Sequence, residues 1–408
     1  MKIGIGFATG RKNFQKVLRT NIYNWKEDNL TDKDQATLHL FVAYDLDYNN
    51  TKRGDYTNIS SDLQRELESC TFICKNSMQT EIESLINDGV IDSEEAKLLF
   101  RKGYAAKRNM ILYYAIKNKM DCLIFLDDDE YPMAVTNNNK SAIWGGQHVI
   151  STHLRNISYA DITNGYHCGY VSPIPHIEFN EKLKEEQFKD FIEAISNDII
   201  NWDKLKGIME NGGVTYAEVP VLVSKVISEV AEVKGAKFIS GANLCINLKD
   251  CTRIFPFYNP PGARGEDTFL STCLTDRKVL RVPTYTFHDG FLTYRHLLEG
   301  ILPTKLSFIN ADTPQIKMRF YKACVGWIRY KPLLVYITEP DDFEEKMVDI
   351  RAKLVNILPC LADFFQMEEF NHILVEFDKY RKNVVKHYAD FQKTQESWAK
   401  LMEHLDRA

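Results

Sequence analysis

Long apolar runs are absent from the sequence. No window of about 18 apolar residues occurs along the 408 residues, so no membrane-spanning helix is expected. The opening segment, MKIGIGFATG, has no basic stretch followed by a long apolar run, so a secretory signal is not expected either. These absences favour a cytoplasmic protein, with a peripheral position at the inner face of the membrane as the alternative.

A paired-cysteine pattern is also absent. The nine cysteines are scattered along the chain, and Cys70 and Cys74 are the only close pair. No second pair completes a zinc-binding pattern. We therefore expect reduced thiols, which are usual in cytosolic proteins.

The chain has no excess of basic residues. Lys and Arg number 51 against 56 Asp and Glu, giving a formal net charge of −5 and a pI of about 6.1. Nucleic-acid-binding proteins normally present a basic face, so nucleic acid is not expected as a partner. A small anion held by local positive charges is compatible with this balance. The length allows two to three domains, or one large domain with an appendage.

Strand and helix patterns alternate along the first 300 residues. Residues 2–8 have the pattern of a short apolar strand, residues 14–25 have apolar side chains at helical spacing, and residues 38–44 predict a second strand. A strand, a helix and a strand in this order open a parallel α/β sheet. The further expected elements are helices over 104–116 and 268–274, and strands over 122–126, 160–171, 237–248 and 279–287.

The resulting prediction is an α/β domain over residues 1–300, with a mostly parallel sheet flanked by helices. Two polar, mostly helical segments at about 48–101 and 178–235 are predicted to be insertions in this domain. Residues 301–408 are rich in Lys, Glu and aromatic residues at helical spacing, and they predict a helical C-terminal region. No internal repeat or low-complexity tract is present.

Three glycines near the N-terminus, Gly4, Gly6 and Gly10, fit a loose dinucleotide-binding fingerprint. In that fingerprint the glycines follow the first strand, whereas only residues 1–3 precede Gly4 here. Gly4 and Gly6 therefore fall inside the strand, and a nicotinamide-dependent enzyme is not favoured.

An apolar run ends in four consecutive acids in LIFLDDDEYP, residues 123–132. Parallel α/β sheets bind ligands at the carboxyl ends of their strands, so these carboxylates are expected at the ligand edge. Helix capping would explain one aspartate but not three. A divalent cation such as Mg²⁺ or Mn²⁺ prefers carboxylate oxygens and would relieve the repulsion between them. A D-x-D motif alone is common by chance, so its interpretation depends on the rest of the chain.

Three blocks of the sequence resemble the GT-A glycosyltransferases, and among them the large inverting family 2. The blocks are GYAAKRNMILYYAIKNKMDCLIFLDDDEYP (103–132), FISGANLCINL (238–248) and PPGARGEDTFLSTCLTDRKVLRVPTYTFHDG (260–290). They are similar to the family's Arg-Asn helix and D-x-D strand, its Gly-Gly-Asn strand near the acceptor, and its Glu-Asp block leading to a His. The order and spacing agree over about two thirds of the chain. The resemblance implies a GT-A sheet and a metal-dependent sugar transfer from a nucleoside-diphosphate sugar to an acceptor hydroxyl.

The resemblance gives donor-binding roles to residues at the strand ends. Asp45 would accept a hydrogen bond from the nucleobase, and Arg108 would support the base or ribose pocket. Asp127 would contact the ribose, with Asp128 beside it. The family's Pro-x-Tyr-Asn start is replaced here by ATGR, in which Ala8 is expected on the donor side. The nucleotide is therefore not fixed by these residues; a UDP-sugar is favoured, and a GDP-sugar is the alternative.

The resemblance implies that Asp129 binds the metal, Mn²⁺ or Mg²⁺. His288 matches a position that contacts the metal or the diphosphate. Asp267 would be the general base that deprotonates the acceptor hydroxyl. The predicted helix start in GEDTFLS favours its charged form. The structural alternative is that Glu266 and Asp267 only cap this helix.

The sugar or acceptor side is expected to include Trp144, Gly241 and Glu266. Aromatic faces stack on the C–H surfaces of sugars, although core packing is the usual role of a tryptophan. Arg264, in the loop GARGED, would donate to the diphosphate or remain a solvated loop residue. The chain resembles enzymes that extend surface polysaccharides, so the expected acceptor is a glycan, a glycoconjugate or a lipid-linked molecule.

The basic and aromatic stretch 317–337 has two interpretations. It could contact an anionic membrane surface or a lipid-linked acceptor. Alternatively, it is a helix packed on the catalytic domain with its basic residues in solvent. The basic residues are Lys317, Arg319, Lys322, Arg329 and Lys331.

Two further enzyme functions and one binding function are compatible with parts of the pattern. A nucleotidyltransferase acting on a sugar phosphate would need a loop rich in Gly, Arg and Lys after the first strand. The segment ATGRKN has one residue of each kind and so matches such a loop only weakly. A retaining glycosyltransferase and an inactive domain that only binds a sugar nucleotide also remain open. The intact Asp127, Asp129, Asp267 and His288 argue against the inactive domain.

Overall fold

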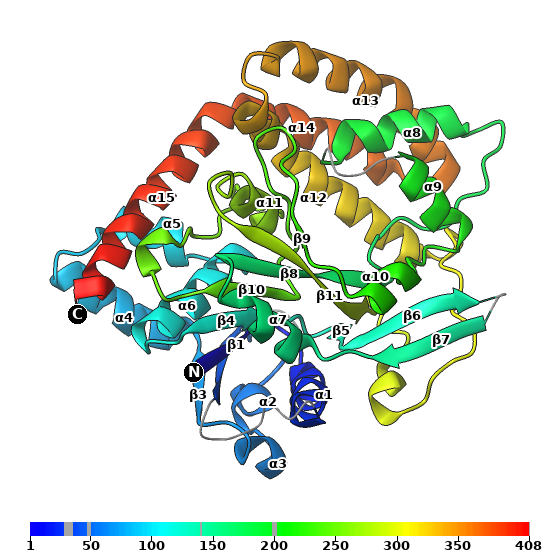
Figure 1. Cartoon of the computed structure of the whole chain (residues 1–408). Helices are drawn as coiled ribbons and strands as arrows, with labels where there is room; N and C mark the ends of the chain where they lie inside the picture. The colour runs from blue at the N-terminus through cyan, green and yellow to red at the C-terminus, as the bar shows by residue number, and fades with distance from the viewer. Residues whose placement is uncertain (28–35, 47–49, 139–140, 198–201, 408) are drawn as a thin grey trace.

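The protein has an α/β architecture in which one large mixed sheet is joined to a group of long C-terminal helices (Figure 1). The computed structural model describes residues 1–27, 36–46, 50–138, 141–197 and 202–407. Parts of the two predicted insertions, residues 48–49 and 198–201, lie outside the described residues. All nine cysteines are unpaired, which confirms the expectation of reduced thiols.

Within the described part of the chain, nine strands form the main sheet in the order β3-β2-β1-β4-β10-β8-β11-β5, with β9 paired to β11. The strands are β1 (Lys2–Thr9), β2 (Thr37–Tyr44), β3 (Ser69–Ile73), β4 (Cys122–Phe125), β5 (Glu130–Tyr131), β8 (Ile162–Gly169), β9 (Ser228–Glu229), β10 (Leu244–Asn247) and β11 (Val279–His288). A separate hairpin consists of β6 (Met133–Asn138) and β7 (Ser141–Gly146).

Six of these strands run in one direction. β1 is parallel to β2 and β4, β2 is parallel to β3, and β8 is parallel to β11. β10 is antiparallel to both β4 and β8, and the short β5 is antiparallel to β11. The sheet is therefore mixed, where the sequence predicted a mostly parallel one. The six strands still end at one edge, and β10 begins at that edge.

Helices cover the sheet and form the C-terminal region. Those before residue 300 are α1 (Phe14–Glu27), α2 (Arg53–Thr57), α3 (Ser61–Gln64), α4 (Lys75–Asn87), α5 (Ser93–Phe100), α6 (Tyr104–Lys117), α7 (Val149–Ile157), α8 (Glu185–Ile195), α9 (Trp202–Glu210), α10 (Val219–Ser224) and α11 (Glu266–Ser271). The later ones are α12 (Pro314–Thr338), α13 (Phe343–Phe365), α14 (His372–Lys382) and α15 (Val384–Arg407).

Most predicted elements are present, with two differences. The strand expected over 237–248 is confined to β10, because the chain turns before it at Asn243, which has a φ of 48°. The segment 48–101 contains β3 as well as helices, and β3 forms one edge of the main sheet.

Gly4 and Gly6 lie inside β1, as the sequence predicts, and their lack of a side chain permits close packing. A Cβ at Gly4 would lie 2.9 Å from the Leu123 side chain, and one at Gly6 would lie 2.8 Å from the Ile111 side chain. Contacts this short would displace β4 or α6. The two glycines therefore serve packing within the sheet domain and not a phosphate loop.

The C-terminal helices share a hydrophobic core with the α/β part. Phe269 of α11 contacts the rings of Tyr330 in α12 and Phe391 in α15. Trp398 of α15 is buried in a second cluster that includes Leu99 of α5. Each fully buried aromatic side chain contributes roughly 1.5–3 kcal/mol to stability. The C-terminal helices are thus packed on the α/β part through α11 and α5.

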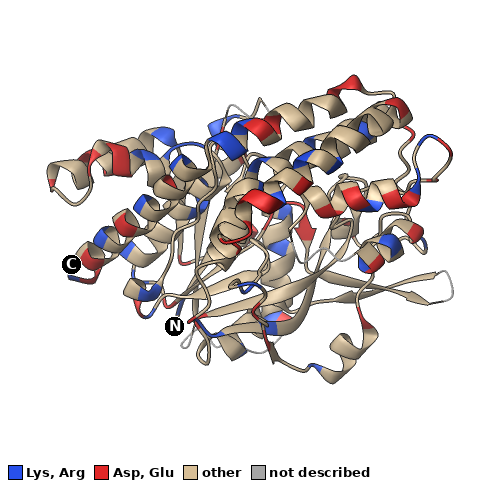
Figure 2. Cartoon of the chain, turned by 90° about the horizontal axis from the view of Figure 1, so that it is seen from above, with Lys and Arg blue, Asp and Glu red and all other residues tan. Residues whose placement is uncertain are grey.

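The basic stretch 317–337 lies entirely on α12, and several of its charges contact other parts of the protein. Lys331 is buried and donates to the Ser196 carbonyl at 2.6 Å, and Arg329 pairs with Glu376 at 2.8 Å, whereas Lys322 is exposed. Basic and acidic residues are interspersed along the C-terminal helices (Figure 2). No helix in the described ranges is long and apolar enough to cross a membrane. This packing agrees with the second interpretation, and membrane contact stays a prediction.

Candidate functional site

The candidate site lies at the sheet edge where the six strands end. β1 ends at Thr9, β4 leads into Asp127 and β11 ends at His288. The loop before β10 also reaches this edge, because β10 runs in the opposite direction. Backbone topology thus brings segments from four parts of the sequence to one place, where α/β sheets usually bind ligands.

Arg108 of α6 connects three of these segments. Its Nη2 lies 3.2 Å from Asp127 Oδ1, and its Nε lies 3.4 Å from Glu266 Oε1. Its Nη1 donates to the Gly241 carbonyl. The side chain is 3% exposed, and its guanidinium lies 5.1 Å from the centre of the Phe125 ring. Burial alone would lower the pKa of Arg108, but the neighbouring carboxylates raise it, so the residue stays charged.

Asp267 faces the loop before β10. Its Oδ2 accepts a hydrogen bond from the Gly241 N–H at 3.1 Å, and its Oδ1 accepts one from the Thr268 N–H at 2.9 Å. The residue before the helix is Gly265, and its neighbour Glu266 is paired with Arg108, so neither predicted acid is the N-cap residue of α11. Burial and the charge of Glu266 raise the pKa of Asp267 to about 6, against the opposing effect of Arg108.

Asp127 is the most exposed of the three aspartates that follow β4. Its side chain is 35% exposed, against 10% for Asp128 and 11% for Asp129. Desolvation of the carboxylate and the negative charges of the adjacent acids raise the pKa of Asp127 to about 7. The positive charge of Arg108 has the opposite, smaller effect. Asp127 is therefore held by Arg108 on one side and is open to a ligand on the other.

Asp128 and Asp129 are turned towards the loop that follows β1. Arg11 Nη1 lies 3.0 Å from Asp128 Oδ1 and also pairs with Asp129 Oδ2. The Thr9 hydroxyl donates to Asp128 Oδ2. Burial raises the pKa of Asp128 to about 6, whereas His288 and Arg11 hold the pKa of Asp129 below its ordinary value despite burial. The sequence did not identify Arg11 as a partner of these acids.

His288 lies beside Asp129, as the predicted metal site requires. Its Nε2 is 3.6 Å from Asp129 Oδ2, and its Nδ1 donates to the Tyr170 carbonyl at 2.8 Å. Burial alone would lower the pKa of His288, but Asp129 and Glu130 raise it to about 9. The imidazole is therefore protonated at neutral pH.

The donor groups at Asp129 do not fit a divalent cation as they are arranged. Among the residues that the structure describes, no group of three or more His, Cys, Asp or Glu side chains could hold a metal ion. Asp129 is paired with the Arg11 guanidinium, and a protonated His288 has no lone pair to offer on Nε2. Binding of Mn²⁺ or Mg²⁺ by Asp129 and His288 stays a prediction. It requires Arg11 to leave Asp129 and His288 to lose its Nε2 proton.

Glu130 belongs to a buried polar group that the sequence did not reveal. Its Oε2 accepts from the Thr286 hydroxyl at 2.6 Å and lies 3.1 Å from His167 Nδ1. Glu130 lies on β5, whose pairing with β11 places it opposite His288. Through these contacts with Thr286 and His167, Glu130 fixes the end of the acidic loop.

Two residues predicted on the base side lie near the end of β1. Asp45, which follows β2, is 3.9 Å from Lys107 Nζ, and that amine also donates to the Thr9 carbonyl at 3.4 Å. Ala8 is 8% exposed, so a contact with the donor would have to use its backbone. Asp45 therefore lies next to the site, on the β2 side of it, whereas Asp267 lies on the β10 side.

Trp144 and Arg264 were also predicted as site residues, and both lie at its periphery. Trp144 lies on β7, its Nε1 donates to the Pro303 carbonyl at 2.8 Å, and its ring packs on Phe287 at 4.9 Å. Arg264 is exposed and lies against Gly326 of α12. The Trp144 contacts are those of a packing residue, while Arg264 is free to reach a ligand from the rim.

Asn109 lies beside Arg108 on α6 but has a structural role. It is fully buried, and its side chain donates to the carbonyls of Leu99 (3.1 Å) and Phe257 (2.9 Å) and accepts from the Phe257 N–H (2.7 Å). Replacing Asn109 by Ala leaves these buried groups without partners, so we expect the free energy of unfolding to fall by roughly 2–4 kcal/mol. Urea denaturation measures the change. The same replacement at the exposed Asn118 of this region is the control, and an equal loss there would contradict this role.

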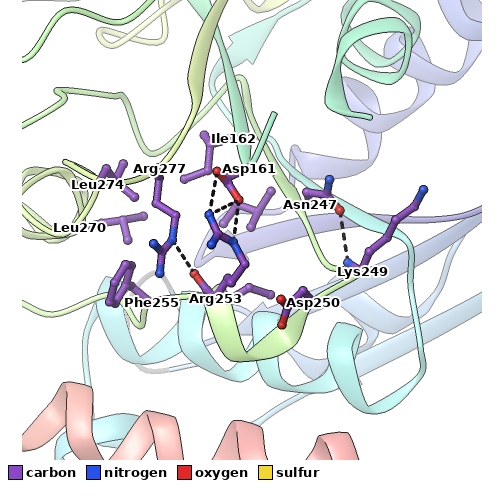
Figure 3. Close-up of a pocket in the computed structure, with 12 residues that line it drawn as sticks. Asp161, Ile162, Asn247, Lys249, Asp250, Arg253, Phe255, Leu270, Leu274 and Arg277 are labelled. Atoms are coloured by element: carbon purple, nitrogen blue, oxygen red, sulfur yellow. Dashed lines mark hydrogen bonds and ion pairs between the residues drawn. The ribbon is translucent and has the colours of Figure 1, made fainter. Parts of the chain in front are cut away.

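A pocket of about 210 Å³ lies where β8 begins and β10 ends, at the edge of the sheet opposite the acids that follow β4 (Figure 3). In it Arg253 pairs with Asp161 through Nε and Nη2, at 3.2 and 3.3 Å. The Arg277 guanidinium lies 4.8 Å from the centre of the Phe255 ring. These charged groups are directed at one another and at the aromatic ring, so the pocket does not offer an evident reactive group.

Comparisons with known proteins add no assignment, since no protein-family model and no curated protein matches the chain. The functional interpretation therefore depends on the geometry of the site and on the motifs of the sequence.

Proposed function

We propose that this protein is a glycosyltransferase of the GT-A type, which moves a sugar from a nucleoside-diphosphate sugar to an acceptor hydroxyl. The observation that supports the proposal is the set of contacts of Arg108. One buried guanidinium contacts Asp127 from the D-x-D block, Glu266 from the Glu-Asp block and Gly241 from the Gly-Ala-Asn block. The three blocks that resemble family 2 are thus neighbours in space.

Asp267 is the proposed general base. Inversion at the sugar needs one base that removes the acceptor proton on the side opposite the leaving group. The pKa of Asp267, about 6, is high for an aspartate and lies close to neutral pH, where a base combines sufficient ionisation with sufficient proton affinity. The Gly241 N–H fixes one carboxylate oxygen, which orients the group.

Asp127 is the proposed contact to the donor ribose. Its partial exposure leaves the carboxylate accessible, and Arg108 fixes its orientation from the buried side. The donor is expected to be a UDP-sugar or a GDP-sugar, and the acceptor a glycan, a glycoconjugate or a lipid-linked molecule.

The pH dependence of transfer tests the role of Asp267. Its pKa is raised to about 6 in the folded protein, so acidification through this value protonates the carboxylate and removes the base. We expect the rate to be constant at higher pH and to fall about tenfold per pH unit below it. The measurement is initial rate against pH with saturating donor and acceptor. A rate that stays constant down to pH 5 would place the base elsewhere.

Product analysis tests the reaction itself. The protein is incubated with UDP- and GDP-sugars and an array of glycan acceptors, and released nucleoside diphosphate is measured. For any active pair, proton NMR of the first product gives the anomeric configuration. Inversion relative to the donor supports Asp267 as base, whereas retention would support a retaining glycosyltransferase.

A nucleotidyltransferase is the second candidate, and the position of Arg11 supports it. Arg11 of the ATGRKN loop reaches the acids after β4, and Lys107 lies near the end of the same strand. Two cations beside β1 are suited to a triphosphate. Formation of pyrophosphate from a nucleoside triphosphate and a sugar phosphate would support this reaction in place of sugar transfer.

A further inference from the structure

Positive charges surround Asp129 from three elements. Arg11 comes from the loop after β1, His288 from the end of β11, and Arg319 from α12 in the C-terminal region. Burial lowers the pKa of Arg319. The charge of Asp129 raises this pKa, and the charges of Arg11 and Arg264 lower it, so these side chains are within electrostatic reach of Arg319. We name Arg11 and Arg319 the cationic cluster.

Arg319 is the member with unused hydrogen-bonding capacity. Its guanidinium lies over the Phe291 ring at 4.3 Å, and its buried Nε has no hydrogen-bond partner within the described chain. No carboxylate of the described residues forms an ion pair with it. Its Nη2 lies against Gly290, where an added Cβ would be 2.5 Å from that nitrogen and 3.0 Å from His288 Cε1. Arg319 and His288 therefore converge on the same small residue.

The acids near Arg319 are engaged by other groups. Arg11 is paired with Asp128 as well as Asp129, and His288 lies 3.6 Å from the same carboxylate oxygen of Asp129. Asp289 is engaged elsewhere, because its carboxylate accepts from the N–H groups of two residues in the following turn. A desolvated arginine without a carboxylate partner is costly unless a ligand supplies the negative charge.

We propose that the cationic cluster binds the diphosphate of the donor, at the place where the resemblance predicts a divalent cation. Arg319 offers a fork of N–H donors to phosphate oxygens, and Arg11 adds a second guanidinium beside Asp129. The diphosphate then binds without a metal ion. This inference rests on the proposed function for the identity of the ligand, but the cluster would also bind inorganic pyrophosphate.

Calorimetric titration with UDP, GDP and inorganic pyrophosphate, first in EDTA and then in Mn²⁺, tests the inference. We expect binding in EDTA and a loss of affinity of about tenfold or more in Arg319→Gln. Arg319→Lys should recover part of it. Lys322→Gln, which removes an exposed positive charge from the same helix, should leave it unchanged.

Gly290→Ala is the second variant, because it displaces the Arg319 guanidinium without removing its charge. It should also weaken binding in EDTA, and thermal melting of each variant shows whether it folds. Nucleoside diphosphate binding that requires Mn²⁺ and is unaffected by Arg319→Gln would overturn this inference but leave the transferase intact. Pyrophosphate binding that depends on Arg319, with no binding of any nucleoside diphosphate, would support the cluster and remove the transferase.

Discussion

Replacing Asp267 by Asn is expected to lower sugar transfer by about 10²–10⁴-fold while leaving donor affinity nearly unchanged. The amide cannot take the acceptor proton, but its oxygen can still accept the hydrogen bond from the Gly241 N–H, so the local structure should be kept. The measurement pairs initial rates of nucleoside diphosphate release with calorimetric titration of the donor. A lower transfer rate with unchanged donor affinity indicates a base. A residue that only positions the donor would lower both the rate and the affinity.

The matched control for this variant is Asp276→Asn. Asp276 follows α11 by a few residues, and its side chain is 70% exposed. The same chemical change there should leave the rate within about twofold of the parent protein, because surface replacements away from the site have small effects. Full transfer activity in Asp267→Asn would show that another group is the base.

Replacing Arg108 by Met is expected to destabilise the protein by roughly 3–5 kcal/mol. The guanidinium is buried against Asp127 and Glu266, so its removal leaves two carboxylates without their shared cation. It also removes a donor to the Gly241 carbonyl. The free energy of unfolding from urea denaturation measures the loss. Since unpaired carboxylates are neutralised by protons, the loss should be smaller at pH 5 than at pH 8.

The control for Arg108 is an arginine in an exposed pair. Arg351 contacts Asp378 through Nε at 2.9 Å and Nη2 at 3.1 Å on the surface of the C-terminal helices. Arg351→Met should change stability little, because solvent screens exposed ion pairs. Equal effects of the two replacements would contradict a central role for Arg108 in joining the three blocks.

The sequence predicted the elements whose patterns are local. Strand β1, helix α6 and strand β4 are read from apolar periodicity, and the acids after β4 are placed at the ligand edge by the direction of that strand. The proximity of Asp129 and His288 was also predicted, and they lie 3.6 Å apart. Short-range patterning and strand direction determine the elements and the position of the acids, whereas the pairing of Asp129 with His288 was implied by the resemblance to family 2.

Features that depend on long-range packing could not be predicted. β10 lies between β4 and β8 and runs antiparallel to both. Neither its position nor its direction is encoded in a local sequence pattern. Arg319 was interpreted as part of a basic helical surface, because the sequence does not say which face of α12 meets the sheet edge. Arg11 pairs with Asp128 and Asp129, which are 117 and 118 residues away in the sequence. Each of these required the three-dimensional arrangement.

Ligand preference decides whether the site is built for a nucleoside-diphosphate sugar. UDP, GDP, CMP and their sugars are compared with UTP, GTP and CTP by calorimetric titration, with and without Mn²⁺. We expect one nucleoside diphosphate and its sugars to bind more tightly than the corresponding triphosphate, and Asp127→Asn to weaken this binding by at least about tenfold. Failure of every nucleoside diphosphate to bind in either condition, or a clear preference for a triphosphate, would contradict the proposed sugar transfer.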